Sequence, residues 1–358
     1  AVAFAGILTV IRSIPTMWNS LKIGVNEIMR RGVPAEGKLR TDRDLPMSFV
    51  FGAAAIVIAL IAILPHAIGE GGPFWIRGIG AVCIAAFAFL FVTVSSRIVG
   101  MVGVTSNPTS GMTIVALLGT SMLFALLGWT DDFGKAAALT VGTVVAVAAS
   151  IAGDISQDLK TGYIIGATPA RQQVGEMMGA IVPAFFIAAA VWLLGEAFTF
   201  GSAELPAPQA TLMKTVIEGV LQADLPWGLV FIGAGISLVA QLVGLRPLAF
   251  AVGIYLPLST MTPVFIGGVL RWMVENVFTK KGEELEGRSD QGILFGSGLI
   301  AGEGIMGVLI AFYAFFLGKP AGLGIAWPEP WGEALSFIIF MSLGLWLLSI
   351  ARRRQPVV

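Results

Sequence analysis

The chain has 358 residues, of which 56% are hydrophobic and only 12% are charged, and its mean hydropathy is +0.87. Soluble domains carry about 25% charged residues, so this composition excludes a soluble protein and predicts an all-α, polytopic membrane protein. The formal net charge of +0 lacks the basic excess of nucleic-acid-binding proteins, so we expect the lipid bilayer, and no nucleic acid, as a partner.

The chain opens with an apolar run, residues 1–14, that has neither an initiator Met nor a signal-peptide pattern. We expect this run to end a span that starts earlier, in a longer protein whose missing spans contribute half of any site. Residues 15–46 form a connector rich in Lys and Arg, which the positive-inside tendency places in the cytoplasm. The acidic segment 196–224 is expected outside. Spans are predicted near residues 47–64, 76–96, 112–128, 136–152, 177–194, 225–244, 291–317 and 333–350.

The chain contains one cysteine, Cys83, and one histidine, His66, and neither has a second potential metal ligand of these types nearby. We therefore expect no disulfide, no metal site and no cofactor. The sequence has no Gly-Lys-Ser/Thr phosphate loop, so we expect an ion gradient rather than ATP as the energy source. It also lacks the repeated carboxylate motifs of metal-dependent membrane transferases, so we do not expect an enzyme.

Residues 247–278 lie between two connectors that both look cytoplasmic, so they must cross the membrane twice or not at all. Two full spans of about 20 residues each do not fit in this length. Pro257 and Pro263, with Ser259 and Thr260 between them, mark the expected break of a discontinuous or re-entrant hairpin. The alternative is a misplaced span elsewhere.

Residues 153–173, GDISQDLKTGYIIGATPARQQ, form a polar segment between two predicted spans. If this segment begins as a helix, Asp154, Gln157, Asp158 and Thr161 share one face, which can line a polar path. The interleaved Gly and Pro residues favour irregular backbone beside a cavity. A solvated cytoplasmic connector is the alternative interpretation.

Glu303 stands alone as a charge near the middle of a predicted span. A carboxylate at this depth costs about 2.5 to 3.5 kcal/mol on insertion scales, so it needs a partner or a proton. The functional interpretation is proton coupling or substrate contact. The structural interpretation is an interhelical hydrogen bond, because Gly298 and Gly302 form a small-xxx-small pair that permits close helix approach.

Two further groups of uncharged polar residues point to ligand recognition. In SNPTSGMT, residues 106–113, Ser110 or Thr109 is placed to cap the next helix and leave its positive end facing a ligand carboxylate, or to act as a plain cap. Tyr255, near Ser259 and Thr260, and Gln241 in the preceding span suit hydrogen bonding to a peptide-like ligand, or equally helix packing.

Four motifs, matching in order, closely resemble the oligopeptide transporter family in its bacterial branch, which is related to the yellow-stripe-like metal-chelate transporters. The similarity covers almost the whole chain and is to the C-terminal half or somewhat more of such a transporter. The motifs are SNPTSGMTI, AGDISQDLKTGYIIGATPARQQ, FAVGIYLPLSTMTPVFIGGVLRW and GILFGSGLIAGEGIMGVLIA.

The resemblance implies a secondary transporter that moves small peptides, or metal chelates in the yellow-stripe branch, together with protons. Its NPxSGMT motif maps onto Asn107, Pro108, Ser110, Gly111, Met112 and Thr113, and its DxxQDxKTGY motif onto Asp154, Gln157, Asp158, Lys160, Thr161, Gly162 and Tyr163. We take these motif residues as residues of the substrate pathway.

Together these observations predict a single transmembrane transporter domain over residues 1–358, in the cell (inner) membrane, that imports oligopeptides or similar solutes by alternating access. Its partners would be the peptide-like solute and protons, with a homo-oligomer as a further option. Glu303 and either Asp154 or Asp158 would exchange protons, and Lys160 would pair with a carboxylate of the polar segment or of the ligand. The residues expected to hydrogen-bond the solute are Asn107, Ser110, Gln157 and Tyr255.

Three alternatives stay open. A metal-chelate or siderophore transporter of the same family would show metal-dependent uptake. A membrane enzyme acting on lipid-linked substrates would require a divalent metal at Asp154 and Asp158. A non-transporting scaffold subunit would bind no solute.

Overall fold

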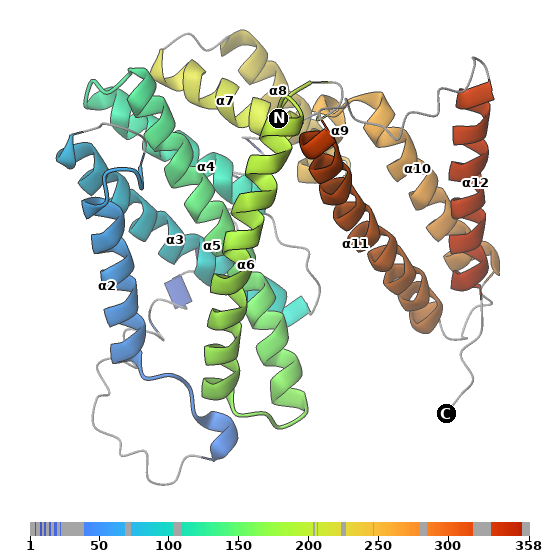
Figure 1. Ribbon diagram of the computed structural model, residues 1–358, viewed down its shortest axis with the longest axis horizontal. Coiled ribbons are helices and arrows are strands. Elements are labelled where there is room, and N and C mark those ends of the chain that lie inside the picture. The colour runs from blue at the N-terminus through green and yellow to red at the C-terminus, as the bar shows by residue number, and fades with distance from the viewer. Residues whose placement is uncertain are drawn as a thin grey trace. The chain divides into compact units, whose positions relative to one another are not determined.

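The computed structural model describes residues 39–68, 73–102, 109–202, 205, 207–222, 227–245, 247–278, 285–317 and 331–352, with a few isolated residues before position 39. In these ranges all regular structure is helical, which confirms the predicted all-α class (Figure 1). Seven helical segments of the described residues are long and apolar enough to cross a membrane. The protein is therefore a multi-pass membrane protein.

These seven segments contain α2 (Met47–Ile63), α3 (Phe74–Val102), α4 (Thr109–Leu126), α5 (Asp132–Ile164), α6 (Pro169–Ala197), α11 (Leu285–Leu317) and α12 (Trp331–Ala351). They coincide with seven of the predicted spans, and most of them are longer than predicted. Polar residues at their ends continue the helices beyond the apolar runs on which the prediction rested. The predicted opening span, residues 1–14, lies outside the described ranges.

Shorter helices complete the chain. The predicted span 225–244 is the 16-residue helix α8 (Trp227–Leu242), which is apolar but shorter than the seven. The segment 247–278 is divided, as predicted, and the break lies before Pro257, whereas Pro263 lies inside a helix without ending it. The remaining elements are η1 (Arg40–Asp42), α7 (Pro208–Leu221), α9 (Pro247–Tyr255), α10 (Leu258–Met273) and the π-helical turn η2 (Val274–Phe278).

Helix α7 lies in the acidic segment 196–224, which the sequence analysis treated only as an outer connector. Met213, Ile217 and Leu221 recur every four residues along α7 and are all buried. This apolar stripe packs against α4 and α5. The acidic segment 196–224 therefore contains an amphipathic helix that packs on the other helices.

The chain divides into two compact units, residues 1–184 with 208–254 and residues 185–207 with 255–358, and each is described by itself. In the first unit α5 packs closely on α3 and α4 (Figure 1). Small residues make this possible, because Ala138, Gly142 and Ala149 of α5 are buried in the contact. Ser95 of α3 donates a hydrogen bond to the carbonyl of Ala149.

The second unit contains α10, η2, α11 and α12. Helix α11 approaches α12 at Gly292, where an added Cβ would lie 3.2 Å from the Cβ of Ala351. One turn further along, the rings of Phe295 and Trp346 meet edge to face, with centroids 4.9 Å apart. Helix α10 contacts α12 through Leu270, whose Cδ1 would lie 3.5 Å from a Cβ added at Gly344.

Candidate functional site

The polar segment 153–173 is the tip of the helical hairpin formed by α5 and α6. Helix α5 is 33 residues long, or about 50 Å, whereas the hydrocarbon core of a bilayer is about 30 Å thick. Its last turns, from Gly153 to Ile164, therefore extend beyond the length needed to span. The segment begins as a helix, as the shared polar face required. The irregular backbone expected from its Gly and Pro residues was wrong for this part, because α5 is a continuous helix up to Ile164.

The predicted polar face of α5 points away from its packed face. Asp154 and Asp158 are exposed, whereas Ala152 and Gly153 are buried. Ser96 of α3 donates to the carbonyl of Ala152 at 3.4 Å, which marks the face that contacts α3. Of the four polar residues of the predicted face, Asp154, Asp158 and Thr161 are exposed and Gln157 is half-buried.

A tight turn joins α5 to α6. Gly166 has a φ of 75°, a left-handed conformation that favours glycine. Two backbone hydrogen bonds close the end of α5, from Gly166 N to Tyr163 O at 3.2 Å and from Ala167 N to Gly162 O at 2.7 Å. This is the Schellman arrangement, and Pro169 then starts α6 at the position where its missing N–H costs nothing.

A segment distant in sequence holds this turn. We call residues 39–45, which precede α2, the docked segment. The guanidinium of Arg40 donates to Gly166 O at 2.7 Å and to Thr168 Oγ1 at 2.8 Å. The backbone of the docked segment also satisfies the start of α6, because Ala170 N donates to Arg43 O at 2.9 Å.

Gln173 of α6 completes the attachment. Its Oε1 accepts a hydrogen bond from Leu45 N at 3.0 Å, and its Nε2 donates to Asp44 Oδ1 at 3.2 Å. The cytoplasmic connector predicted at 15–46 therefore does not end as a free loop, because its last residues are bonded to the polar segment.

Next to the turn, α5 and α6 run antiparallel, and polar side chains lie between the two helices. The side chain of Gln172 lies directly over Gly162, where an added Cβ would overlap its amide. One turn deeper, Asp158 of α5 and Gln172 are the polar groups that face Glu176 of α6. Both carboxylate oxygens of Glu176 are buried, beside the neutral amide of Gln172 and a second carboxylate.

The sequence analysis missed Glu176. Burying an ionised carboxylate beside a second carboxylate and without a cation is costly, so this side chain favours a proton, a cation or a further donor. The signal was present in the sequence, because Glu176 is the only charged residue between Arg171 and Glu196. The same reasoning that singled out Glu303 therefore applies to it.

The other motif residues of α5 lie around this tip. Lys160 is exposed and forms no ion pair with another described residue, so a ligand carboxylate remains its predicted partner. Gln157 is half-buried, and its carbonyl accepts from Thr161 Oγ1 at 3.2 Å. Tyr163 is exposed in the last turn of α5.

The NPxSGMT residues lie at the start of α4. Asn107 and Pro108 fall outside the described ranges, and Ser110 and Gly111 already belong to the helix. Thr113 is buried and donates to the carbonyl of Thr109 at 2.8 Å. Capping of α4 by a side chain stays a prediction.

Two uncharged residues predicted to contact the solute are Gln241, in the first unit, and Tyr255, the first residue of the second unit's segment 255–358. Gln241 of α8 has a buried Oε1 without a hydrogen bond among the described residues, and Ser237, one turn earlier, has a buried hydroxyl in the same condition. Buried polar groups are nearly always hydrogen-bonded, so the Gln241 amide and the Ser237 hydroxyl each need a polar partner. Tyr255 is the last residue of α9, and its side chain falls outside the described residues.

Glu303 lies on α11, in the second unit. It is exposed and makes no hydrogen bond or ion pair with another described residue. A Cβ added at Gly298 or Gly302 would meet no described atom within 4 Å. The close helix packing predicted at these glycines therefore stays a prediction.

Comparison with known proteins places the chain in a family. The profile of the OPT oligopeptide transporter protein family matches residues 1–314. The chain belongs to this family. The resemblance drawn from the four motifs is confirmed, and no solved structure matches the OPT chain.

Three relatives show the breadth of this OPT family. The "Putative oligopeptide transporter" of Haemophilus influenzae is 32% identical over 323 residues, which cover 79% of this chain and 51% of the relative. The "Probable metal-nicotianamine transporter YSL8" of Arabidopsis thaliana is 25% identical over 73% of this chain and 37% of its own length. The "Putative oligopeptide transporter YGL114W" of Saccharomyces cerevisiae is 26% identical over 57% of this chain and 29% of its own length. The chain thus spans about half the length, or less, of the curated relatives it matches.

Proposed function

We propose that this OPT chain is part of a proton-coupled transporter of the cell (inner) membrane that imports oligopeptides or similar solutes. The observation that carries the proposal is the buried Glu176 carboxylate of α6, which faces the carboxylate of Asp158 on α5. A buried carboxylate that faces a second one is less costly with a proton than with a second negative charge. Such a pair couples a proton to any rearrangement that separates its members.

In the proposed mechanism the polar face of α5 contacts the solute. Gln157 and Thr161 donate or accept hydrogen bonds, and Lys160 attracts the carboxylate end of a peptide. Binding beside Asp158 changes the charge that faces Glu176, so proton uptake and solute uptake become linked. Alternating access then exposes this face to either side in turn. Glu303 serves as a second proton-carrying group of the transporter.

The second candidate is metal-chelate transport. Its support is the similarity to relatives that are named as metal-nicotianamine transporters in plants. Asp154 and Asp158 would then face a chelate that carries both a metal and free carboxylates. A homo-oligomer, a lipid-linked substrate and a scaffold role rest on the sequence arguments alone.

The deciding experiment is uptake by proteoliposomes that contain the full-length transporter, with labelled tri- to pentapeptides or a labelled iron chelate, with and without an inward proton gradient. We expect peptide accumulation only with the gradient. Glu176→Gln should reduce accumulation at least tenfold and leave exchange of labelled for unlabelled peptide intact, because the amide cannot carry the proton. Glu303→Gln is expected to behave in the same way.

The matched control is Glu196→Gln, which changes a carboxylate at the far end of the same helix. Unchanged accumulation in Glu196→Gln with loss in Glu176→Gln supports the proposal. Gradient-driven uptake at the wild-type rate in Glu176→Gln would remove the proton role of that residue. Accumulation of the chelate alone would assign the protein to metal-chelate transport.

A further inference from the structure

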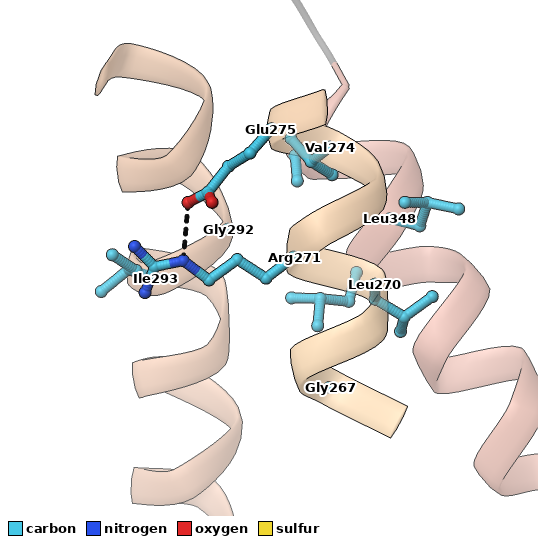
Figure 2. Close-up of a pocket in the computed structure, with 10 residues that line it drawn as sticks. Gly267, Leu270, Arg271, Val274, Glu275, Gly292, Ile293 and Leu348 are labelled. Atoms are coloured by element: carbon cyan, nitrogen blue, oxygen red, sulfur yellow. Dashed lines mark hydrogen bonds and ion pairs between the residues drawn. The ribbon is translucent and has the colours of Figure 1, made fainter. Parts of the chain in front are cut away.

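The second unit contains a pocket that the proposed transport mechanism does not use. It has a volume of about 150 Å³ and lies between α10 with its π-helical continuation, α11 and α12 (Figure 2). Sites that enclose a whole small molecule measure about 300 to 1,000 Å³, so this pocket holds only part of a ligand. Its walls are the apolar side chains of Leu270, Val274, Ile293, Leu347, Leu348 and Ala351, with Gly267 and Gly292.

The pocket lies at the end of its helices that reaches the surface of the membrane. Helix α12 spans 21 residues, or about 31 Å, which is close to the thickness of the hydrocarbon core, and the pocket is lined by its last turns up to Ala351. Helix α11 supports the same position, because the pocket residues Gly292 and Ile293 are among the first residues of its apolar stretch Gln291–Leu317. The pocket is therefore level with the lipid headgroups and the first carbons of the acyl chains.

One charged pair stands at the pocket. Arg271 bonds Glu275 through its Nε, at 2.7 Å from Oε1, and Figure 2 shows the guanidinium reaching across the pocket toward α11. Neither terminal nitrogen of Arg271 has a hydrogen bond to another described residue, and the side chain is 63% exposed. An arginine in this state keeps a two-pronged donor for a phosphate.

Among the described side chains at the pocket and next to it, two are positive, Arg271 and Arg352, and one is negative, Glu275. Glu275 neutralises one charge, but Arg352 follows the pocket residue Ala351 directly and lies with its Cζ 4.2 Å above the ring of Phe278. Two more arginines, at 353 and 354, continue the chain. The positive-inside tendency assigns this tail to the cytoplasm, where the leaflet is anionic.

We propose that this pocket binds one anionic phospholipid of the cytoplasmic leaflet, with its phosphate at Arg271 and part of an acyl chain in the apolar cavity. The small volume of the pocket fits this proposal, because the rest of the lipid's acyl chain would stay in the bilayer. The nearby Arg352 strengthens the positive field at the headgroup. The π-helical turn at Val274 supports the site, since it interrupts regular packing where the cavity opens.

The test is native mass spectrometry of the purified full chain with equal amounts of phosphatidylglycerol and phosphatidylcholine. We expect one phosphatidylglycerol to be retained in preference to phosphatidylcholine. Arg271→Gln should lower the retained phosphatidylglycerol at least tenfold. The matched control is Lys214→Gln, because Lys214 also forms an exposed i,i+4 pair with a glutamate, Glu218 on α7, and neither residue lines the pocket.

A second pair of variants tests the cavity without touching the charge. Gly267 lines the pocket, and a Cβ there meets no described atom within 4 Å, so we expect Gly267→Leu to occupy the cavity, expel the acyl chain and abolish retention. Its neighbour Gly268 is equally open but does not line the pocket, so Gly268→Leu should retain the lipid. The comparison of Gly267→Leu with Gly268→Leu tests the proposed lipid site even if Arg271→Gln fails to fold.

Water-soluble probes separate a lipid site from a phosphate site. Glycerol phosphate and inorganic phosphate should not compete with phosphatidylglycerol at millimolar concentration, because neither fills the cavity. Competition by either would reduce the pocket to a phosphate site and overturn the proposal. Equal retention of both phospholipids, or of lipid in wild type and Gly267→Leu alike, would overturn it as well. The readout needs no transport, so its failure leaves the proposed function untouched.

Discussion

Gly142 of α5 lies against the side chain of Leu117 of α4. A methyl group added there would lie 2.6 Å from the Cγ of Leu117, a side chain that is fully buried. Overpacking of this kind costs about 1 to 3 kcal/mol. We therefore expect Gly142→Ala to lower the thermal midpoint of the detergent-solubilised protein.

The control for this substitution is Gly175→Ala on α6, where an added Cβ would meet no described atom within 4 Å. Alanine is favoured over glycine in a helix by about 1 kcal/mol, so this variant should be unchanged or slightly more stable. Equal midpoints for the two variants would contradict the close approach of α4 and α5.

At the scale of elements, hydrogen bonds join the docked segment to the turn between α5 and α6 and to the start of α6. Removing the Arg40 side chain breaks two hydrogen bonds to Gly166 and Thr168, and their exposure limits the loss to about 1 kcal/mol. We expect Arg40→Ala to increase amide exchange about five-fold at residues 166–173, measured by hydrogen–deuterium exchange.

Arg171→Ala is the matched control for Arg40→Ala, because Arg171 is also an exposed arginine at the tip and its side chain has no hydrogen bond among the described residues. Exchange in that variant should stay at the wild-type rate. If Arg40→Ala leaves the exchange rate of residues 166–173 unchanged, the docked segment does not hold the tip.

At the scale of the whole molecule, the helical order makes a prediction about sidedness. Helix α5 crosses the membrane once, so Thr130 before it and Thr168 after it should lie on opposite sides. A cysteine at position 168 should react with an impermeant thiol reagent only from the cytoplasmic side, and one at position 130 only from outside. The native Cys83 is buried and should not react, which provides the background. Labelling of both positions from one side would contradict a single crossing by α5.

Apolar runs were sufficient to predict the existence of the spanning helices, because a helix that crosses a bilayer must be apolar for most of its length. They could not predict how far α5 extends, since Asp154 and Lys160 interrupt hydropathy without interrupting the helix. Helix α7 was missed for a related reason: its stripe of Met213, Ile217 and Leu221 lies among charges that were interpreted as those of a connector.

The candidate site was predictable only in part. The polar face of α5 followed from helical periodicity, and Glu176 could have been found from its isolation in the sequence. The contacts of Arg40 and Gln173 could not, because they join positions more than 120 residues apart, largely through backbone atoms that every residue carries. Nothing in the local sequence specifies such a pairing.

The short tip between α5 and α6 also affects how digestion by trypsin is interpreted. Trypsin needs an exposed stretch that can be drawn into an extended form, and loop tips usually provide one. Here Lys160 and Arg171 both belong to helices, and the turn between them is closed by Gly166 and bonded to Arg40. A hairpin that survives digestion from the cytoplasmic side is therefore no sign that it faces the other compartment; its resistance reports folding rather than sidedness.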